Sequence, residues 1–224
     1  MTPATDIQLA RLLQLASPAL PVGAYSYSQG LEAAIEAGVV HDAASAATWI
    51  GDVLDYSLAR AEAPIFLRLI DAWRAGELDA VAHWNLLFLA SRETAELRAE
   101  TVQMGYSLAR LLSELGQGVG LERVEEISFP TAFAFAVARW DIDARPALTA
   151  YLWAWLENQV MAALKAVPLG QTDGQRILMS LGERLAAVAD RAASLADDEL
   201  GSFAPRLAIL SSRHETQYSR LFRS

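Results

Sequence analysis

The chain has 224 residues, 53% of them apolar, and a formal net charge of −9. This length is enough to bury one substantial core, whereas the acidic balance argues against binding to nucleic acid, which requires a basic face. No charge-free apolar run reaches the roughly 18 to 20 residues that a membrane span requires, and the lack of cysteine excludes disulfides and thiolate metal sites.

Helical periodicity dominates the first half of the sequence. The predicted helices cover residues 5–16, 27–37, 43–61, 64–75 and 77–90. Gly38 closes the second of these helices, Asp42 is the expected N-cap of the third, and Pro64 is tolerated in the first turn of the fourth. Because the N-terminal stretch lacks the basic region, apolar core and cleavage site of a secretory signal, we expect a cytoplasmic protein.

The clearest helix in the sequence follows, with one buried stripe at spacings of three and four residues. The stripe comprises Leu97, Thr101, Met104, Leu108, Leu111 and Leu115, and the helix ends at Gly116. Further helices are predicted over residues 129–139, 146–166 and 173–195, the last with Thr172 and Gln175 as a capping box. The predicted fold is therefore all-α, a single-domain helical bundle of about eight to ten helices.

Two loops are more elaborate than a connection between helices requires. The first loop, residues 17–32 (SPALPVGAYSYSQGLE), uses two prolines to hold an extended path. It then presents Tyr25, Ser26 and Gln29, and the last two have the spacing of a capping box for the next helix. The alternative is a structural corner in which Tyr25 or Tyr27 packs inward.

The second loop, residues 165–176 (KAVPLGQTDGQR), joins two long helices through a Pro-x-Gly turn. It begins with Lys165, the only lysine in the sequence. The helix that follows has free backbone N–H groups, which are suited to an acidic partner. Ordinary helix-joining chemistry is the alternative explanation for most of this loop.

The C-terminal tail, residues 211–224 (SSRHETQYSRLFRS), lies in a region whose charge opposes that of the remaining chain. Residues 201–224 contain four Arg and one Glu, whereas residues 1–200 contain 14 Lys or Arg and 26 Asp or Glu. We therefore divide the chain into an all-α body, residues 1–210, and a partner-docking tail.

The tail also has the pattern of a short amphipathic helix. Ser212 and Glu215 form a potential capping box, and Tyr218, Leu221 and Phe222 would then share one helical face. A helix this short needs another surface to cover its apolar side. A frayed terminus is the alternative.

The sequence provides little for catalysis or metal binding. His41, His83 and His214 lie far apart, and none has a second ligand at the spacing of a metal site, although a weak ligand role at an interface remains open for His214. The glycine-containing loops lack the strand, helix and Lys-Ser or Lys-Thr of a phosphate site. The acidic run 197–199 is typical of a solvated surface. We expect no enzyme activity, no bound cofactor and no metal site.

Four segments together resemble the urease accessory protein F family, which comprises helical maturation factors of nickel urease. They are SPALPVGAYSYSQGLE, SRETAELRAETVQMG, WAWLENQVMAALKAVPLGQTDGQR and the terminal SSRHETQYSRLFRS, in this order along nearly the whole chain. The tail and the K-x-VPLGQ-x-x-GQ segment are the most specific of these. Small variations such as Ala24 leave the prolines of the first loop, its Gly23 and SYSQGLE intact.

The resemblance implies an all-α protein, commonly a homodimer, that bridges accessory protein D, also called H, on the urease apoprotein to the accessory GTPase G, for delivery of nickel. It assigns the surface toward the GTPase to Tyr25, Ser26, Gln29, Lys165, Pro168 and Gln171. It assigns the surface toward accessory protein D or H to Arg213, His214, Glu215, Tyr218, Arg220 and Phe222.

Three mechanisms are compatible with these features. The leading hypothesis is a non-enzymatic scaffold or chaperone with protein partners and no membrane or nucleic-acid partner. The second is a GTPase-activating regulator, in which an Arg of this chain acts in trans on the phosphoryl group in the partner's active site. The third, an all-α metal-dependent enzyme built on the acidic clusters, would require tight magnesium binding by the isolated chain.

Overall fold

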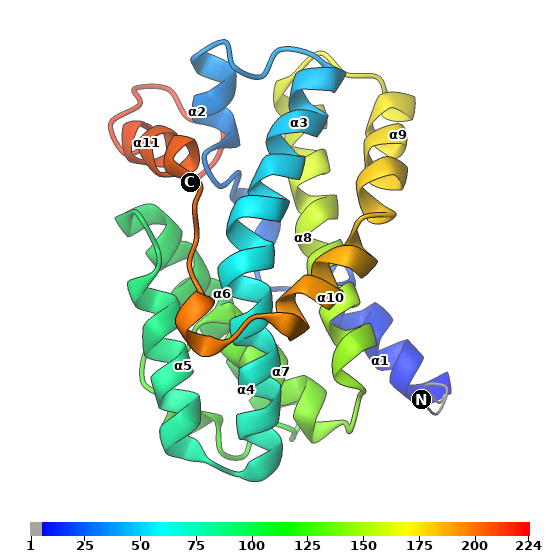
Figure 1. The fold of residues 1–224 in the computed structure, drawn as a ribbon, viewed down its shortest axis with the longest axis vertical. Coiled ribbons are helices and arrows are strands. Elements are labelled where there is room, and N and C mark those ends of the chain that lie inside the picture. Colours follow the sequence, from blue (N-terminus) through cyan, green and yellow to red (C-terminus); the bar gives the residue numbers. More distant parts are fainter. Residues whose placement is uncertain (1–5) are drawn as a thin grey trace.

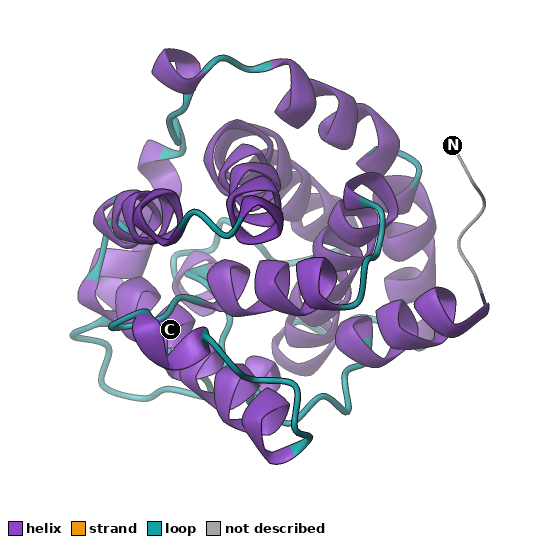
Figure 2. Ribbon diagram, turned by 90° about the horizontal axis from the view of Figure 1, so that it is seen from below, coloured by secondary structure: helices purple, strands orange, loops and turns teal. Residues whose placement is uncertain are grey.

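The computed structural model describes residues 6–224, and over that range every regular element is helical. The all-α prediction is therefore confirmed. Turns and loops join each helix to the next (Figures 1 and 2). The predicted helix start at residue 5 lies outside the described residues.

The helices follow the chain in this order. The first half contains α1 (Asp6–Ala16), α2 (Leu31–Glu36), α3 (Ala43–Val53), α4 (Ala63–Ala75), α5 (Leu78–Ala90) and α6 (Ala95–Glu114). The second half contains α7 (Phe129–Arg139), α8 (Ala144–Ala166), α9 (Gln171–Gly182), α10 (Leu185–Ser194) and α11 (Pro205–His214). Single turns of 3-10 helix lie at η1 (Ala24–Ser26), η3 (Leu121–Arg123) and η4 (Asp197–Glu199), and a π-helix, η2, spans Leu54–Glu62.

An aromatic cluster marks the centre of the core, where α4, α7 and α8 meet. The rings of Phe66 and Tyr151 are stacked with centroids 4.6 Å apart, and Phe133 meets both of them edge-on. Phe66 and Phe133 are fully buried, and burial of each such side chain contributes roughly 1.5–3 kcal/mol. We call Phe66, Phe133 and Tyr151 the aromatic core.

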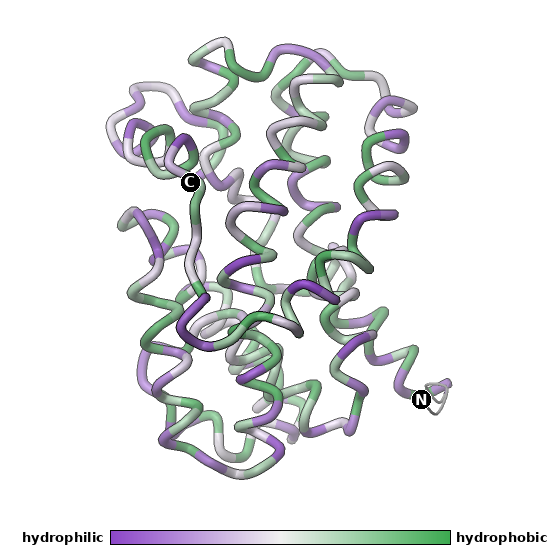
Figure 3. The backbone as a smooth tube through the Cα atoms, in the orientation of Figure 1, coloured by the Kyte–Doolittle hydropathy of each residue, from purple (hydrophilic) through white to green (hydrophobic). Residues whose placement is uncertain are grey.

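Apolar and polar residues alternate along the turns of helices such as α4 and α10, as expected for helices that bury one face, whereas α7 is buried on all sides from Pro130 to Val137 (Figure 3). On α6 the first four residues of the predicted stripe are buried. Leu115 is 51% exposed, because it lies beyond the last turn of the helix. The predicted N-cap of α3 is confirmed, since Asp42 accepts a hydrogen bond from the backbone N–H of Ser45 at 2.8 Å.

The predicted break between helices 43–61 and 64–75 is wrong. α3 continues through the π-helix into α4, where Pro64 occupies the first turn. Within the π-helix the N–H of Ala63 donates to the carbonyl of Leu58, five residues back. Proline has no N–H to donate, and the wider helical turn accommodates it without ending the helix.

The predicted single helix over 173–195 is also wrong, because the chain forms α9 and α10 with a turn between them. Helix α9 begins earlier than predicted, and its cap is not the Thr172–Gln175 pair. Instead the carboxylate of Asp173 accepts from the N–H of Gly170 at 3.3 Å. The carboxylate thereby satisfies one of the backbone donors at the helix start.

The helix predicted over 27–37 is shorter than expected, since α2 begins only at Leu31. Gln29 and Gly30 have positive φ angles of 52° and 77°, so the chain turns sharply before the helix. A residue at a positive φ cannot lie within a right-handed helix. The predicted Ser26–Gln29 capping box therefore does not form.

Candidate partner-binding surface

The first loop places one tyrosine outward and one inward. Tyr25, within the η1 turn, is 73% exposed, whereas Tyr27, directly after it, is buried. The side-chain amide of Asn158 on α8 donates to the carbonyl of Tyr27 at 3.2 Å. This contact holds the loop against the bundle and leaves Tyr25 available to another molecule.

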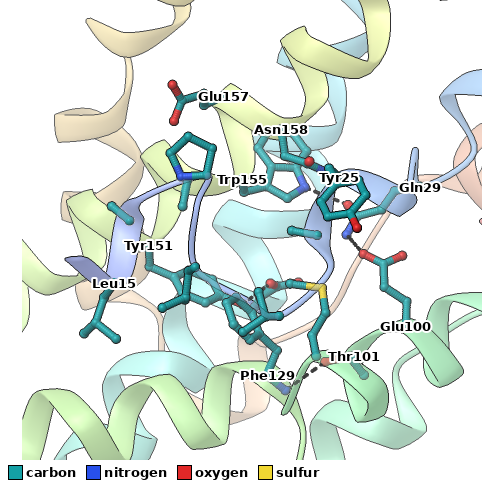
Figure 4. Close-up of a pocket in the computed structure, with 18 of the residues that line it drawn as sticks. Leu15, Tyr25, Gln29, Glu100, Thr101, Phe129, Tyr151, Trp155, Glu157 and Asn158 are labelled. Carbon is teal, nitrogen blue, oxygen red and sulfur yellow. Dashed lines mark hydrogen bonds between the residues drawn. The ribbon is translucent and has the colours of Figure 1, made fainter. Parts of the chain in front are cut away.

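Gln29 joins three parts of the molecule (Figure 4). Its Nε2 donates to Glu100 of α6 at 2.7 Å, and its Oε1 accepts from the indole N–H of Trp155 on α8 at 2.6 Å. Both polar ends of this half-buried side chain therefore have partners within the protein. Gln29, although assigned to the GTPase side, therefore uses its side chain to hold the first loop on α6 and α8.

The second loop leaves its assigned residues at the surface. Lys165 lies near the end of α8, Pro168 follows in the connection, and Gln171 begins α9; all three are exposed. The Lys165 ammonium lies 4.8 Å from the centroid of the Phe222 ring, in a cation–π contact. A residue assigned to the GTPase side thus contacts one assigned to the side of accessory protein D or H.

The predicted helix over the C-terminal tail is wrong. α11 begins at Pro205 and ends at His214, so Ser212 lies in its last turn and residues 215–224 are irregular. The N–H groups of Leu221 and Phe222 donate to the carboxylate of Glu32, at 2.6 and 2.9 Å. Because these donors are used by a carboxylate, they are not available to a helical ladder.

Three carboxylates hold the tail on the body, and we call them the acidic seat: Glu32 of α2, and Glu96 and Glu100 of α6. The imidazole of His214 is fully buried between the first two. Its Nδ1 lies 2.6 Å from Glu96 and its Nε2 lies 3.1 Å from Glu32. Arg220 also pairs with Glu96. The basic tail thus binds an acidic surface of its own chain.

The end of the tail is joined to the first loop. The carbonyl of Ser224 accepts from the N–H of Ser28 at 2.8 Å, and its hydroxyl donates to Glu100 at 2.7 Å. The N–H of Arg223 donates to the carbonyl of Ser26, also at 2.8 Å. Ser28 and Ser224 are fully buried. In Figure 1 the tail lies beside α2 accordingly.

The six tail residues assigned to a partner divide into two groups. His214 and Phe222 are buried against the body. Arg213, Glu215, Tyr218 and Arg220 are exposed, although Glu215 accepts from the N–H of Ala95 at 3.0 Å. Only the exposed group is directly available to a partner while the tail lies in this position.

A cavity of about 170 Å³ lies beneath the first loop, and Figure 4 shows the residues around it. Its polar wall contains Glu62, Arg92, Glu100 and Tyr151. Arg92 and Glu62 pair at 3.2 Å, and the Tyr151 hydroxyl donates to Glu62. Burial, together with Glu62, raises the pKa of Tyr151 well above its usual range, so this hydroxyl keeps its proton at neutral pH.

Glu100 also lines this cavity and is the most perturbed carboxyl in the site. Burial raises its pKa to about 7, against the lowering effect of its hydrogen bonds from Gln29 and Ser224. Glu32, Glu96 and Glu100 were not among the residues predicted for the site, although they lie within two of the quoted motifs. The sequence signal that could have identified them is the presence of carboxylates in these motifs together with a basic tail in the same chain.

The described residues 6–224 contain no group of three or more His, Asp or Glu side chains arranged to hold a metal ion. The acidic run 197–199 forms a 3-10 turn at the surface, where Asp197 pairs with Arg68. Over the same range no helix is both long and apolar enough to cross a membrane. Neither observation identifies a chemical centre, so the two loops and the tail remain the candidate site.

Comparison with known proteins gives consistent matches. A family model described as UreF matches residues 40–182. The chain is 60% identical over 225 residues to a urease accessory protein UreF of Azoarcus sp. (strain BH72), covering 97% of this chain and 96% of that protein. It is 54% identical to the UreF of Dechloromonas aromatica (strain RCB), covering 98% and 99%. It is also 54% identical to a bifunctional urease accessory protein UreEF of Bordetella bronchiseptica, where it spans 54% of the longer protein.

Proposed function

This chain belongs to the UreF family of urease accessory proteins, and from that premise we propose that it is a non-enzymatic scaffold for urease maturation. It bridges accessory protein D, or H, on the urease apoprotein to the accessory GTPase G, for GTP-dependent insertion of nickel. The proposal places it in the cytoplasm, as a homodimer. Nickel is the cargo of the assembly rather than a resident cofactor of this chain.

The observation that supports bridging is the contact between the two assigned surfaces. Arg223 and Ser224 of the tail are hydrogen-bonded to Ser26 and Ser28 of the first loop, and Lys165 contacts Phe222. A partner that takes hold of the tail therefore acts directly on the loop that carries Tyr25. Two binding sites that share such contacts suit a protein that assembles two partners together.

Capture of accessory protein D or H is tested at Tyr218, whose side chain is fully exposed. We expect Tyr218→Ala to weaken capture at least tenfold without changing the fold, because the ring packs on nothing in its own chain and exposed tyrosines anchor interfaces. The matched control is Tyr106→Ala, an exposed tyrosine on α6 outside the tail. Equal capture by both variants in a pull-down would refute the tail as the docking element.

Recruitment of the GTPase is tested at Tyr25 and Lys165, which are both exposed. Tyr25→Ala removes an exposed ring without opening the core, so we expect weaker recruitment with unchanged thermal stability. Lys165→Ala gives a second test on the other loop. If both variants recruit the GTPase like the wild type in size-exclusion chromatography with GTP, these loops serve folding alone.

The alternative role is a GTPase-activating regulator that uses an Arg in trans. Arg213 is exposed at the end of α11, whereas Arg220 is paired with Glu96. In other GTPases an activating Arg raises the turnover rate by about 10³- to 10⁵-fold. If Arg213→Ala leaves GTP turnover in the reconstituted complex within a few fold, activation by that residue is excluded.

A further inference from the structure

The cavity beneath the first loop is large enough to hold one aromatic ring. Its volume is about 170 Å³, whereas protein interiors contain few voids larger than a water molecule. An engineered protein cavity of about 150 Å³, lined by Leu, Ile and Phe, stays dry and binds benzene. A void of this size therefore has room for a ligand the size of benzene.

The polar wall of the cavity offers little to water. The two carboxylate oxygens of Glu62 accept from Arg92 and from the Tyr151 hydroxyl, and those of Glu100 accept from Gln29 and from the tail. The Nε of Arg92 has no hydrogen-bond partner, but this atom is buried and out of reach of a water molecule in the cavity. Because a buried water needs about two to four polar partners, an apolar occupant suits this cavity better than water.

The rest of the wall consists mainly of aromatic rings and apolar side chains. Phe129 of α7 and Tyr151 and Trp155 of α8 lie around the cavity (Figure 4). Met104 of α6 and Met161 of α8 add thioether groups. Rings pair edge-on or offset with other rings, and methionine sulfur contacts ring edges, with a gain beyond the burial of apolar area. This wall therefore favours an aromatic ring over an aliphatic group of the same size.

The cavity opens within the surface assigned to the GTPase. Tyr25 and Met161 both line it and are exposed, by 73% and 56%. Met161 lies one helical turn before Lys165 on α8, so it extends the surface of the second loop toward the first. Glu157, one further turn back, also lines the cavity. A protein that contacts both Tyr25 and Lys165 therefore covers the opening.

We propose that this cavity is an aromatic socket, which receives one aromatic side chain of the protein that binds the first loop. Aromatic anchors seated in pockets supply much of the binding energy at protein interfaces. The assignment of the anchor to the accessory GTPase rests on the proposed function. The binding of an aromatic ring is a property of this chain alone and is tested separately.

Ring binding is tested with phenol and the isolated full-length chain, by titration calorimetry and saturation-transfer NMR. We expect a dissociation constant of about 1 mM or tighter, which is well within the limit for so small a ligand. Cyclohexanol, an aliphatic ring of similar size, should bind more weakly. Absence of phenol binding, which would mean that the cavity holds only water, or equal binding of cyclohexanol overturns the proposal.

Two substitutions locate the bound phenol. Ala154 of α8 and Ala16 at the end of α1 are half-buried and line the cavity, so Ala154→Leu and Ala16→Leu each fill part of its volume. We expect each variant to bind phenol at least tenfold more weakly. The matched control is Ala10→Leu, at an exposed position of α1 that does not line the cavity, and it should bind phenol like the wild type. If Ala154→Leu does not fold, Ala16→Leu decides by itself, and undiminished binding in that variant, or equal loss in Ala10→Leu, overturns the socket.

The occupant is tested by competition between phenol and the GTPase for the wild-type chain. Phenol at about ten times its dissociation constant should weaken recruitment of the GTPase about tenfold, because both ligands require the same socket. Ala16→Leu should weaken recruitment as well, whereas Ala10→Leu should not. Phenol that binds without weakening recruitment overturns a GTPase side chain as the occupant.

The socket and the proposed function fail in different ways. If the wild-type chain does not recruit the GTPase at all, the proposed function fails and the assignment of the anchor fails with it. Phenol binding and its loss in the two filling variants still decide whether the cavity is a socket for an aromatic ring.

Discussion

The aromatic core and the acidic seat hold two parts of the same chain by different kinds of interaction. At the aromatic core, Phe66, Phe133 and Tyr151 pack their rings together, and the stabilisation comes from apolar area removed from water. At the acidic seat, three carboxylates bind backbone and side-chain donors of the tail at defined distances. The first interaction depends little on direction or pH, whereas the second depends on both.

This difference indicates that the tail, rather than the aromatic core, is the region suited to exchange its contacts. The rings of the aromatic core separate only if the protein unfolds, because no other group would fill the space that a displaced ring leaves. The tail is held by directional hydrogen bonds to the acidic seat, in which Glu32 and Glu96 are half-buried and Glu100 is buried, and such bonds can be exchanged for bonds to another protein. The two regions of this chain are therefore held by different chemistry.

The largest expected effect is at the aromatic core. Phe66→Ala removes a fully buried ring that contacts both Phe133 and Tyr151, so we expect a loss of about 3–5 kcal/mol in the free energy of unfolding. Urea denaturation followed by circular dichroism measures this loss. The exposed substitution Tyr106→Ala is the control and should change stability by less than about 0.5 kcal/mol. A similar loss in both variants would remove the distinction between core and surface.

The next effect is a pH dependence of stability that originates at Glu100. Its pKa is raised from 4.5 to about 7 in the folded chain, so the folded state holds a proton that the unfolded state has released. Stability from this group is therefore greatest below about pH 4.5 and falls as the pH rises to about 7, by on the order of 3 kcal/mol. Urea midpoints between pH 5 and pH 8 measure the slope.

Glu100→Gln sharpens that result, because the variant has no proton to lose in this range. Its unfolding free energy should follow a flatter pH profile than that of the wild type. Phe66→Ala should lower the whole profile and leave its slope unchanged, since the aromatic core does not titrate there. A steep slope that survives in Glu100→Gln would assign the pH dependence to other groups.

A smaller effect, confined to the tail, is expected from Glu32→Gln. The change removes the charge that binds His214 and the N–H groups of Leu221 and Phe222, and charge-assisted hydrogen bonds contribute about 1.5–3 kcal/mol. We expect tail amides to exchange at least tenfold faster while amides of α7 keep their protection. Glu36→Gln, on the same helix but exposed, is the matched control. Equal loss of protection in α7 would show that the tail and the core open together.

Much of the helical fold could be predicted from the sequence, because a helix bonds locally and its apolar face follows a short period. The range predicted for α7, 129–139, is the observed one, and Asp42 caps α3 through a residue only three positions away. The same local arguments failed at Pro64, where a π-helix carries the chain past a residue that usually starts or ends a helix. The four quoted motifs also identified the family, which the comparisons confirmed.

By itself the sequence determined that the chain is all-α, the approximate ranges of several helices, the Asp42 cap of α3, and that the tail is basic where the body is acidic. Only the tertiary structure decided how the tail lies. Its conformation is set by Glu32, Glu96 and Glu100, which are more than a hundred residues away along the chain. Hydrogen bonds over that separation have no period in the sequence, so they exist only once α2, α6 and α11 have packed together. For the same reason the local signal of a helix over residues 212–222 lost to carboxylates that no local pattern could place.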